Sequence, residues 1–197
     1  MKEKEKGKGR RSEKLGKASE IKIENIVATT AISNELDLNA IIEVLPDTKY
    51  EPEKFPGLTL RIKEPKAGNL LFHSGKVVCT GTKSLEDVEL VIDQVCEKIK
   101  SVGFEVRNKP KIQVQNIVAS ADLHTTLNLS SIAIGLGLDR VEYEPEVFPG
   151  LVYRVEEPKV VMLLFSSGKI ICSGARKKED IEEAVNRLRE RLALLVS

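Results

Sequence analysis

Four of the five phenylalanines stand at equivalent places in two similar stretches of the chain. Phe55 and Phe148 each open a Phe-Pro-Gly-Leu turn, and Phe72 and Phe165 each precede a turn that contains Ser-Gly-Lys. Aromatic side chains at strand ends commonly close the rim of a hydrophobic core, and the spacing alone favours that role. The alternative is a binding role, in which the four rings form two pairs of wedges at the ends of an uncharged sheet surface.

Residue types that carry catalysis or bind metals are sparse and poorly spaced. The chain has three cysteines (Cys79, Cys96 and Cys172) with no Cys-x-x-Cys spacing, and two histidines, so we expect neither a disulfide framework nor a zinc site. This cysteine usage is typical of a reducing intracellular compartment. Because no nucleophile stands near a base in a recognisable motif, we expect no enzyme activity, no cofactor and no metal.

Charge is nearly balanced over the whole chain but not along it. There are 31 Lys and Arg against 30 Asp and Glu, yet residues 1–20 hold eight basic and four acidic side chains. We expect these 20 residues to be a flexible solubilising tail, with nonspecific DNA contact as the alternative. The remaining body is neutral to slightly acidic, so any anion binding by the body must be local.

The composition also excludes several classes of protein. A hydrophobic content of 41% is enough for a core, so the chain as a whole is not disordered. No run of 18 apolar residues is present, and the N-terminus lacks the apolar segment of a signal peptide. We therefore expect a folded protein that neither crosses a membrane nor carries a signal peptide.

The chain contains one unit twice. Residues 50–83 align with residues 143–176 at an offset of 93, and 20 of the 34 positions are identical, where about two would match by chance. Upstream, residues 24–29 match residues 115–120 at an offset of 91. The sequence thus predicts a first repeat over residues 21–108 and a second over residues 109–197.

Each repeat reads as strand, helix, several strands and helix. The first strand is expected at 21–29 or 112–120, and a short helix at 36–45 or 129–138. Strands at 58–63, 69–72 and 76–82 are joined by Pro-Gly or Ser-Gly-Lys turns, which favours antiparallel hairpins. An amphipathic helix closes each repeat and has its apolar stripe at Leu85, Val88, Val91, Ile92, Val95 and Ile99, or at Ile181, Ala184, Val185, Leu188 and Leu192. Two helices per repeat cover one face of an antiparallel sheet, so the fold class is α+β and the other face is left open.

Strand alternation assigns residues to that open face. In the first strand, Asn25, Val27 and Thr29 lie opposite Ile26 and Ala28, and the second repeat offers Asn116, Val118 and Ser120. Val78 and Thr80 share the open face, with Arg61 and Arg154 near its margins. The open face is thus neither a charged solvated surface nor an ordinary core.

Several motifs together resemble a known family. NIVAT, YEPEKFPGL, RIKEPK, LLFHSGK and VVCTGTK, each followed by its second copy, closely resemble the core of the TATA-box-binding protein family over about residues 21–195. The sparse glutamine, the absence of a long low-complexity extension and the similarity of the two halves resemble archaeal members more than eukaryotic ones.

The resemblance implies a fold and a function. The fold would be two pseudo-symmetric repeats that form a saddle, with a ten-stranded curved antiparallel sheet and four helices on its convex face. The protein would be a general transcription factor that binds the minor groove of TATA-box promoter DNA and kinks it. It would then nucleate a preinitiation complex with transcription factor B and RNA polymerase.

The resemblance also implies roles for individual residues. DNA intercalation falls to Phe55, Phe72, Phe148 and Phe165. Minor-groove contact falls to Asn25, Val27, Leu70, Val78, Thr80, Asn116, Val118, Leu163, Ile171, Ser173, Pro56 and Pro149. Phosphate contact falls to Arg61, Lys76, Lys83, Arg154, Lys169 and Arg176. Contact with transcription factor B falls to Glu144, Glu146 and Val147.

Further expectations concern location, self-association and a competing function. An archaeal member would be cytoplasmic and nucleoid-associated, and a eukaryotic one nuclear. Without DNA, two copies could associate weakly through the concave face. The competing function is a single-stranded nucleic-acid or RNA-binding sheet module, which would need aromatic side chains in mid-strand for base stacking. Here the phenylalanines stand at strand ends.

Overall fold

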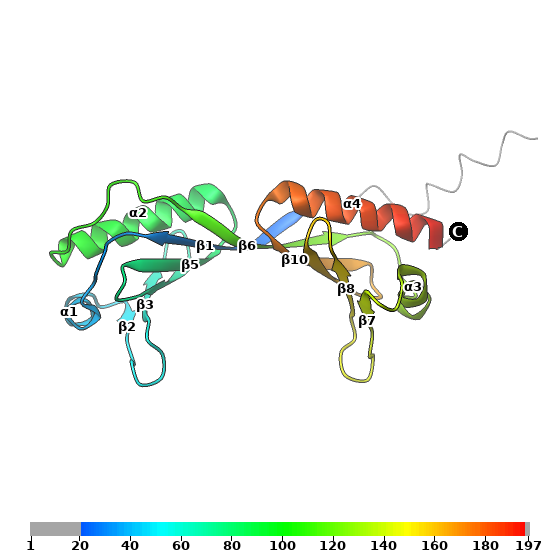
Figure 1. Ribbon diagram of the computed structural model, residues 1–197, viewed down its shortest axis with the longest axis horizontal. Helices are drawn as coiled ribbons and strands as arrows, with labels where there is room; N and C mark the ends of the chain where they lie inside the picture. Colours follow the sequence, from blue (N-terminus) through cyan, green and yellow to red (C-terminus); the bar gives the residue numbers. More distant parts are fainter. Residues whose placement is uncertain (1–20, 196–197) are drawn as a thin grey trace, which may run out of the picture. The chain divides into compact units, whose positions relative to one another are not determined.

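The structure is a computed structural model, and it describes residues 21–195. Elements of the first repeat are β1 (Lys22–Ala31), α1 (Leu38–Val44), β2 (Thr48–Lys49), β3 (Leu58–Ile62), β4 (Ala67–Leu71), β5 (Lys76–Thr82) and α2 (Leu85–Ser101). Elements of the second repeat are β6 (Gln113–Asp122), α3 (Leu129–Leu136), β7 (Val141–Glu142), β8 (Leu151–Val155), β9 (Val160–Leu164), β10 (Lys169–Ala175) and α4 (Lys178–Leu195). The order of elements is the same in both repeats (Figure 1). The tail predicted at 1–20 lies outside the described residues.

The chain divides into two compact units. The first unit is Ile23–Ile117, and the second contains residues 118–195 together with Lys22. Strands of the first unit follow the order β2-β3-β4-β5-β1, and those of the second follow β6-β10-β9-β8-β7. Neighbouring strands pair antiparallel, as the hairpin turns predict; Leu70 pairs with Val78, and Leu163 pairs with Ile171.

The long helix of each unit lies along one face of its sheet (Figure 1). In α2 the buried side chains are Val88, Val91, Ile92, Val95, Cys96 and Ile99. The helix begins at an N-cap, Ser84, whose hydroxyl accepts a hydrogen bond from the Asp87 backbone N–H at 3.0 Å. One expectation for this stripe is wrong, because Leu85 is 50% exposed. Leu85 is the first helical residue, and helical side chains lean toward the N-terminus, so Leu85 leans away from the turns that cover the sheet.

The short helices are shorter than the sequence predicted. The helix expected at 36–45 spans Leu38–Val44, because Asp37 caps it by accepting hydrogen bonds from the Asn39 and Ala40 backbone N–H groups. The helix expected at 129–138 spans Leu129–Leu136 and ends at Gly137, which has a φ of 97°. A residue with this backbone conformation terminates a right-handed helix.

The predicted division of each sheet into two faces is confirmed. In β1, Ile26, Ala28 and Thr30 are buried, whereas the alternate residues from Asn25 to Ala31 are only partly buried. The same alternation holds in β3, β4, β5, β8 and β9. The buried face packs under the long helix, and the other face of each unit stays accessible.

The three cysteines belong to the core. Cys79, Cys96 and Cys172 are all free thiols and buried. Burial raises the pKa of the Cys79 thiol to about 11 and that of Cys172 to about 12. It also raises the pKa of Cys96. A thiol that resists deprotonation is a poor nucleophile and a poor metal ligand, so these cysteines serve as small apolar side chains.

Candidate nucleic-acid interface

The open face of the first unit gathers small polar and apolar side chains from three neighbouring strands. Val27 lies on β1, Leu70 on β4, and Val78 and Thr80 on β5; each is partly buried. The antiparallel register places Val78 beside Leu70 on one side and beside Thr29 on the other. The strands thus assemble an uncharged surface that brings Val27 together with residues more than 40 positions later in the chain.

Asn25 is held in one orientation at this surface. Between Ile26 and Ala28, the pairing of β1 with β5 shifts by one residue, and Gly81 in β5 adopts a φ of 105°. Such a bulge removes a backbone N–H from the regular ladder. The Gly81 N–H donates to Asn25 Oδ1 at 2.7 Å, and Asn25 Nδ2 donates to the Thr80 hydroxyl at 3.1 Å. Because Oδ1 faces the backbone, the second hydrogen on Nδ2 is left to donate to a ligand.

The second unit repeats this surface with one larger apolar side chain, Ile171 in place of Val78. Val118 lies on β6, Leu163 on β9, and Ile171 and Ser173 on β10. Ile171 is 36% exposed, and it lines an open depression of about 710 Å³ together with Pro149 and Phe165. Asn116, on the part of β6 that belongs to the first unit, is partly buried, and both Asn116 and Ser173 have interaction partners. The open face of this unit is therefore also suited to a ligand with an uncharged, flat surface.

The four phenylalanines form two matching pairs. The Phe55 and Phe72 rings have centroids 6.0 Å apart and cross at 67°, and the Phe148 and Phe165 rings have centroids 6.0 Å apart and cross at 70°. Both pairs are edge-to-face contacts, the geometry that aromatic rings prefer. Phe55 is 43% exposed and Phe148 is 38% exposed. Rings that only closed a core would be buried, so the core-rim role favoured by spacing does not account for these two side chains.

A glycine under each pair makes room for the rings. A Cβ atom at Gly57 would lie 2.6 Å from Phe55 Cε1, and one at Gly150 would lie 2.7 Å from Phe148 Cε1. Real Cβ atoms do not approach so closely, so a larger residue at either position would displace the ring. Sequence reasoning did not assign a role to Gly57 or Gly150. The available signal was the Phe-Pro-Gly-Leu turn itself, which is identical in both repeats.

The turns hold the backbone of each phenylalanine in the same way. Glu51 O accepts from the Phe55 N–H, and Glu144 O accepts from the Phe148 N–H, each at 2.9 Å. At the other ring of each pair, the Phe72 and Phe165 N–H groups donate 3.0 Å bonds across the Ser-Gly-Lys turns. The rings are thus presented from fixed backbone, and Pro56 and Pro149 follow at exposed positions.

Six basic side chains lie around the open faces, and two of them form ion pairs with carboxylates. Arg61, Lys76, Lys169 and Arg176 are exposed. Lys83 instead lies 3.1 Å from the Glu24 carboxylate, and Arg154 makes two hydrogen bonds to Glu142, at 2.9 and 3.2 Å. Strand alternation placed Arg61 and Arg154 near the margins of the open face, and the family resemblance assigned all six residues to phosphate contact, but neither indicated these two ion pairs. Lys83 and Arg154 can contact an anion only in competition with a carboxylate.

The two acidic turns differ in how their charge is balanced. Glu51 forms ion pairs with Lys49 at 2.9 Å and with Lys54 at 2.7 Å. The hydrogen bonds to Lys54 and then to Lys49 lower the pKa of the Glu51 carboxyl. In the second turn, Glu144, Glu146 and Val147 are exposed, and Val147 is 80% exposed. The three residues predicted to contact a partner protein therefore lie together on an accessible turn.

The described residues contain neither a metal-binding cluster nor a membrane-spanning helix. Residues 21–195 contain no group of three or more His, Cys, Asp or Glu side chains that could hold a metal ion. Within the same range, no helix is long and apolar enough to cross a membrane.

Comparisons with known proteins give consistent matches. The family model described as transcription factor TFIID, or TATA-binding protein (TBP), matches residues 20–102 and again residues 111–195. The TATA-box-binding protein of Archaeoglobus fulgidus is 54% identical over 175 residues, which cover 89% of this chain and 96% of that protein. TATA-box-binding protein 1 of Methanosarcina acetivorans is 55% identical over 174 residues, which cover 88% of this chain and 95% of that protein.

A solved structure agrees with these matches. The TBP of Methanococcus jannaschii superposes with a TM-score of 0.82 and 45% sequence identity, and the match covers 88% of this chain and 98% of that chain. The expected fold class is confirmed, with two repeats that contain a ten-stranded antiparallel sheet and four helices within residues 21–195. All three of these relatives are archaeal, as the resemblance of the motifs indicated.

Proposed function

The chain belongs to the TATA-box-binding protein family, and on this premise we propose that it binds the minor groove of TATA-box promoter DNA and kinks it. Members of the family are DNA-binding general transcription factors and not enzymes. The observation that carries the proposed kinking is the pair of edge-to-face phenylalanine contacts, each with an exposed ring. The open faces of the two units would supply the groove-binding surface.

The chemistry of the open face favours A·T base pairs. In the minor groove, A·T and T·A pairs present only acceptors, whereas guanine adds an N2 donor. A surface of Val27, Val78 and Leu70 offers no side-chain acceptor for that donor. A G·C pair would therefore bury an unpaired polar group, at a cost of about 1–3 kcal/mol. The Asn25 amide, held with Nδ2 available to donate, suits the A N3 and T O2 acceptors.

Burial of the aromatic rings offsets the cost of kinking. Unstacking a base step costs a few kcal/mol, and two steps would be opened. An aromatic side chain that loses 150–250 Å² of exposed surface contributes at most about 4–6 kcal/mol. Four rings can therefore outweigh two unstacked steps, whereas a single ring could not. Pro56 and Pro149, which follow Phe55 and Phe148, would pack against the sugars beside each kink.

Basic residues would hold the phosphates on either side of the groove. Arg61, Lys76, Lys169 and Arg176 are exposed and ready to do so. Lys83 and Arg154 would first separate from Glu24 and Glu142. Since exposed ion pairs are worth about 0–1 kcal/mol, this exchange opposes DNA binding only weakly.

Assembly with the transcription machinery would use the second acidic turn. Glu144, Glu146 and Val147 offer two carboxylates and an apolar side chain to transcription factor B, which would then bring RNA polymerase to the promoter. In the first turn, Lys54 replaces Val147 and pairs with Glu51, so that turn offers less negative charge. The difference would give the complex a direction on DNA.

Several further assignments belong to the same proposal. The functional division of the chain is a tail at 1–20, a first repeat at 21–108 and a second at 109–197. We place the protein in the cytoplasm on the nucleoid, and we expect two DNA-free copies to associate weakly through their open faces. Burial of the uncharged surface away from water would drive that association.

A gel-shift comparison tests the proposed function. A duplex TATA element should bind at least tenfold more tightly than a G·C duplex of equal length, because each G·C pair leaves a buried donor unpaired. Single strands of either sequence should bind more weakly still. Tighter binding of single strands would favour the competing function, in which bases stack on a sheet.

A further inference from the structure

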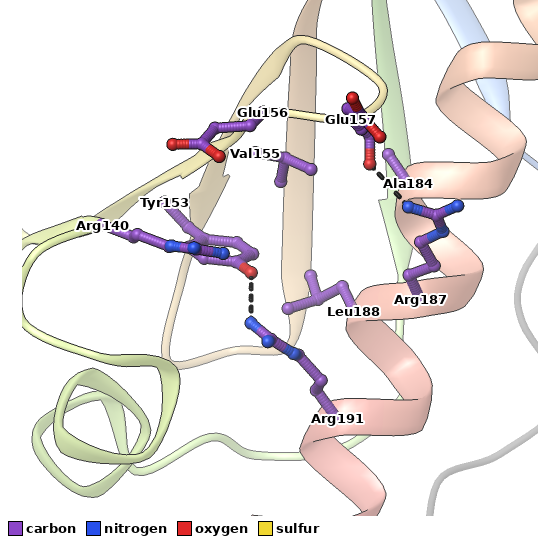
Figure 2. Close-up of a pocket in the computed structure, with 9 residues that line it drawn as sticks. All are labelled: Arg140, Tyr153, Val155, Glu156, Glu157, Ala184, Arg187, Leu188 and Arg191. Carbon is purple, nitrogen blue, oxygen red and sulfur yellow. Dashed lines mark hydrogen bonds between the residues drawn. The ribbon is translucent and has the colours of Figure 1, made fainter.

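A second site lies on the helix-covered side of the second unit, away from its open face. There, a pocket of about 260 Å³ opens between α4 and β8 (Figure 2). Three guanidinium groups reach it from two elements: Arg140 from the segment before β7, and Arg187 and Arg191 from α4. We call it the arginine pocket, and its other lining residues are Tyr153, Val155, Glu156, Glu157, Ala184 and Leu188.

Arg191 is positioned by a buried hydroxyl. Its Nη1 donates to the Tyr153 hydroxyl at 2.8 Å, and Tyr153 is only 5% exposed. Because the hydroxyl accepts this bond, its own hydrogen remains to donate to an anion in the pocket. Arg191 uses one of its five donors here, so most of the guanidinium is left for a ligand.

Arg187 makes a contact that does not need its charge. Its Nη1 donates to the Glu157 backbone oxygen at 2.7 Å. In the first repeat the equivalent residue, Gln94, donates to the equivalent oxygen of Glu64 at 2.8 Å. A neutral amide therefore satisfies the structural requirement. The guanidinium at position 187 must be explained by something else, and its ion pair with Glu183 accounts for only part of its donor capacity.

At Arg140, too, the structural role does not require the charged side chain. The Arg140 backbone oxygen accepts from the Arg154 N–H at 2.9 Å, just as the Asp47 oxygen accepts from the Arg61 N–H at 3.2 Å. The backbone role is thus equal in the two repeats, but the side-chain charge is reversed. The first repeat also has Leu60 where the second has the Tyr153 hydroxyl. Arginine at positions 140 and 187 is therefore a property of the second repeat, whereas the position of Arg191 also carries a cation, Lys98, in the first repeat.

We propose that the arginine pocket binds an acidic peptide segment of a partner protein. A carboxylate of the peptide would receive charge-assisted hydrogen bonds from Arg187, Arg191 and the Tyr153 hydroxyl. An apolar side chain beside that carboxylate would pack on Val155 and Leu188, the apolar part of the lining. Arginine clusters are a recurrent means of recognising acidic motifs.

The charges at the rim favour a peptide over a nucleic acid. Glu156 and Glu157 line the pocket, and Glu183 stands beside Arg187, so a phosphate chain would meet three carboxylates. A short peptide can place a single carboxylate between the arginines and avoid the rim. The volume of about 260 Å³ is also below the roughly 300–1,000 Å³ of typical small-molecule pockets, which suits one or two side chains.

Peptide binding here does not depend on the proposed DNA function. The pocket is on the side of the sheet that α4 covers, and the residues assigned to DNA in this unit lie on the other side. The partner could therefore bind while DNA occupies the open face. A failure of one proposal leaves the other to be judged on its own measurement.

The test is a titration with a fluorescein-labelled peptide with a blocked C-terminus, GLFDG, which carries one carboxylate beside apolar side chains, followed by fluorescence anisotropy. The full chain is compared with the double variant Arg187→Gln and Arg191→Gln. Glutamine at 187 keeps the bond that Gln94 makes in the first repeat, and Arg187→Gln alone serves if the double variant does not fold. The matched control, Lys98→Gln with Lys100→Gln, removes two positive charges from α2.

We expect the peptide affinity to fall at least tenfold in the α4 variant and less than twofold in the control. Binding of a TATA duplex should stay within twofold in both. In a ¹⁵N spectrum of the unmodified chain, the peptide should move the Nε–Hε signals of Arg187 and Arg191. The proposal is overturned if the peptide does not bind at about 1 mM, if both variants lose equal affinity, or if a single-stranded hexanucleotide displaces the peptide from these arginines.

Discussion

The turn between β2 and β3 and the turn between β7 and β8 have the same backbone but carry different charge. Both hold a phenylalanine N–H on a glutamate oxygen at 2.9 Å, and both leave room for the ring with a glycine. Yet Glu51 is neutralised by Lys49 and Lys54. The second turn has Glu142 in place of Lys49 and Val147 in place of Lys54. The two repeats thus share what positions the phenylalanine rings and differ in the charge that the turn presents.

The largest effect is expected when the negative charge of the second turn is reversed. Glu144→Arg with Glu146→Arg should reduce recruitment of transcription factor B about 100-fold or more, because two partly desolvated charge contacts are lost and reversed. Binding to TATA DNA alone should be nearly unchanged. The measurement is a gel-shift of the binary and ternary complexes.

The first turn supplies the control for that experiment. Glu51→Arg with Glu53→Arg should leave recruitment nearly intact, because Glu51 is already occupied by two lysines. Normal ternary assembly by the Glu144 and Glu146 variant, or an equal loss in both pairs of variants, would show that the second turn is not the docking site.

A smaller effect should be equal in the two repeats. Gly57→Ala and Gly150→Ala should each weaken TATA binding about tenfold, because the added Cβ displaces Phe55 or Phe148 and overpacking of this kind costs about 1–3 kcal/mol. In a double-mutant cycle, Gly150→Ala should cost almost nothing once Phe148→Ala is present. Full additivity of those two changes would mean that the glycine does not act through the ring.

The similarity of the open faces predicts weak orientation preference. With Asn25 matched by Asn116 and Thr80 by Ser173, the isolated protein should bind a TATA element in both directions. Cleavage by an iron chelate tethered to one repeat should reveal both orientations. A single orientation above about 95%, which needs about 1.7 kcal/mol of preference, would contradict the proposed equivalence of the two faces.

The smallest effect concerns the charge state of Glu51. Its pKa is lowered by Lys54 and Lys49, so the ion pairs are intact above the usual carboxyl range and are lost as the pH falls through the lowered value. Lys54→Val, which imitates the second turn, should raise the pKa of Glu51. An NMR titration of the Glu51 side chain measures this change, and an unchanged pKa in the variant would show that Lys54 does not hold the carboxylate.

Patterns with a short period were the most predictable features of this chain. Alternation placed Val27 and Val78 on the open face and Ile26 and Ala28 on the opposite one, because strand geometry alone decides the face of each residue. The repeat paired Phe55 with Phe148 and Phe72 with Phe165. The contacts within each ring pair, however, join residues 17 positions apart and follow from the register of β3 with β4 in the first unit and of β8 with β9 in the second.

Features that depend on tertiary contacts could not be predicted from the sequence. The Lys83 ion pair with Glu24 joins residues 59 positions apart, and no local pattern specifies it. The arginine pocket likewise needs the end of α4 to meet β8. The exposure of Leu85 depends on where α2 begins relative to the sheet, which an apolar stripe does not reveal.

The most direct test of the account is the bend that the protein imposes on TATA DNA, measured by fluorescence transfer between labels at the two ends of a duplex. We predict a strong bend with the unmodified chain and a clearly smaller one with Phe148→Ala or Phe165→Ala. Both variants should keep their thermal unfolding close to that of the parent, since Phe148 is exposed and the ring pair lies outside the core under the helices. An unchanged bend angle in folded variants would contradict the assignment of the phenylalanine pairs as wedges.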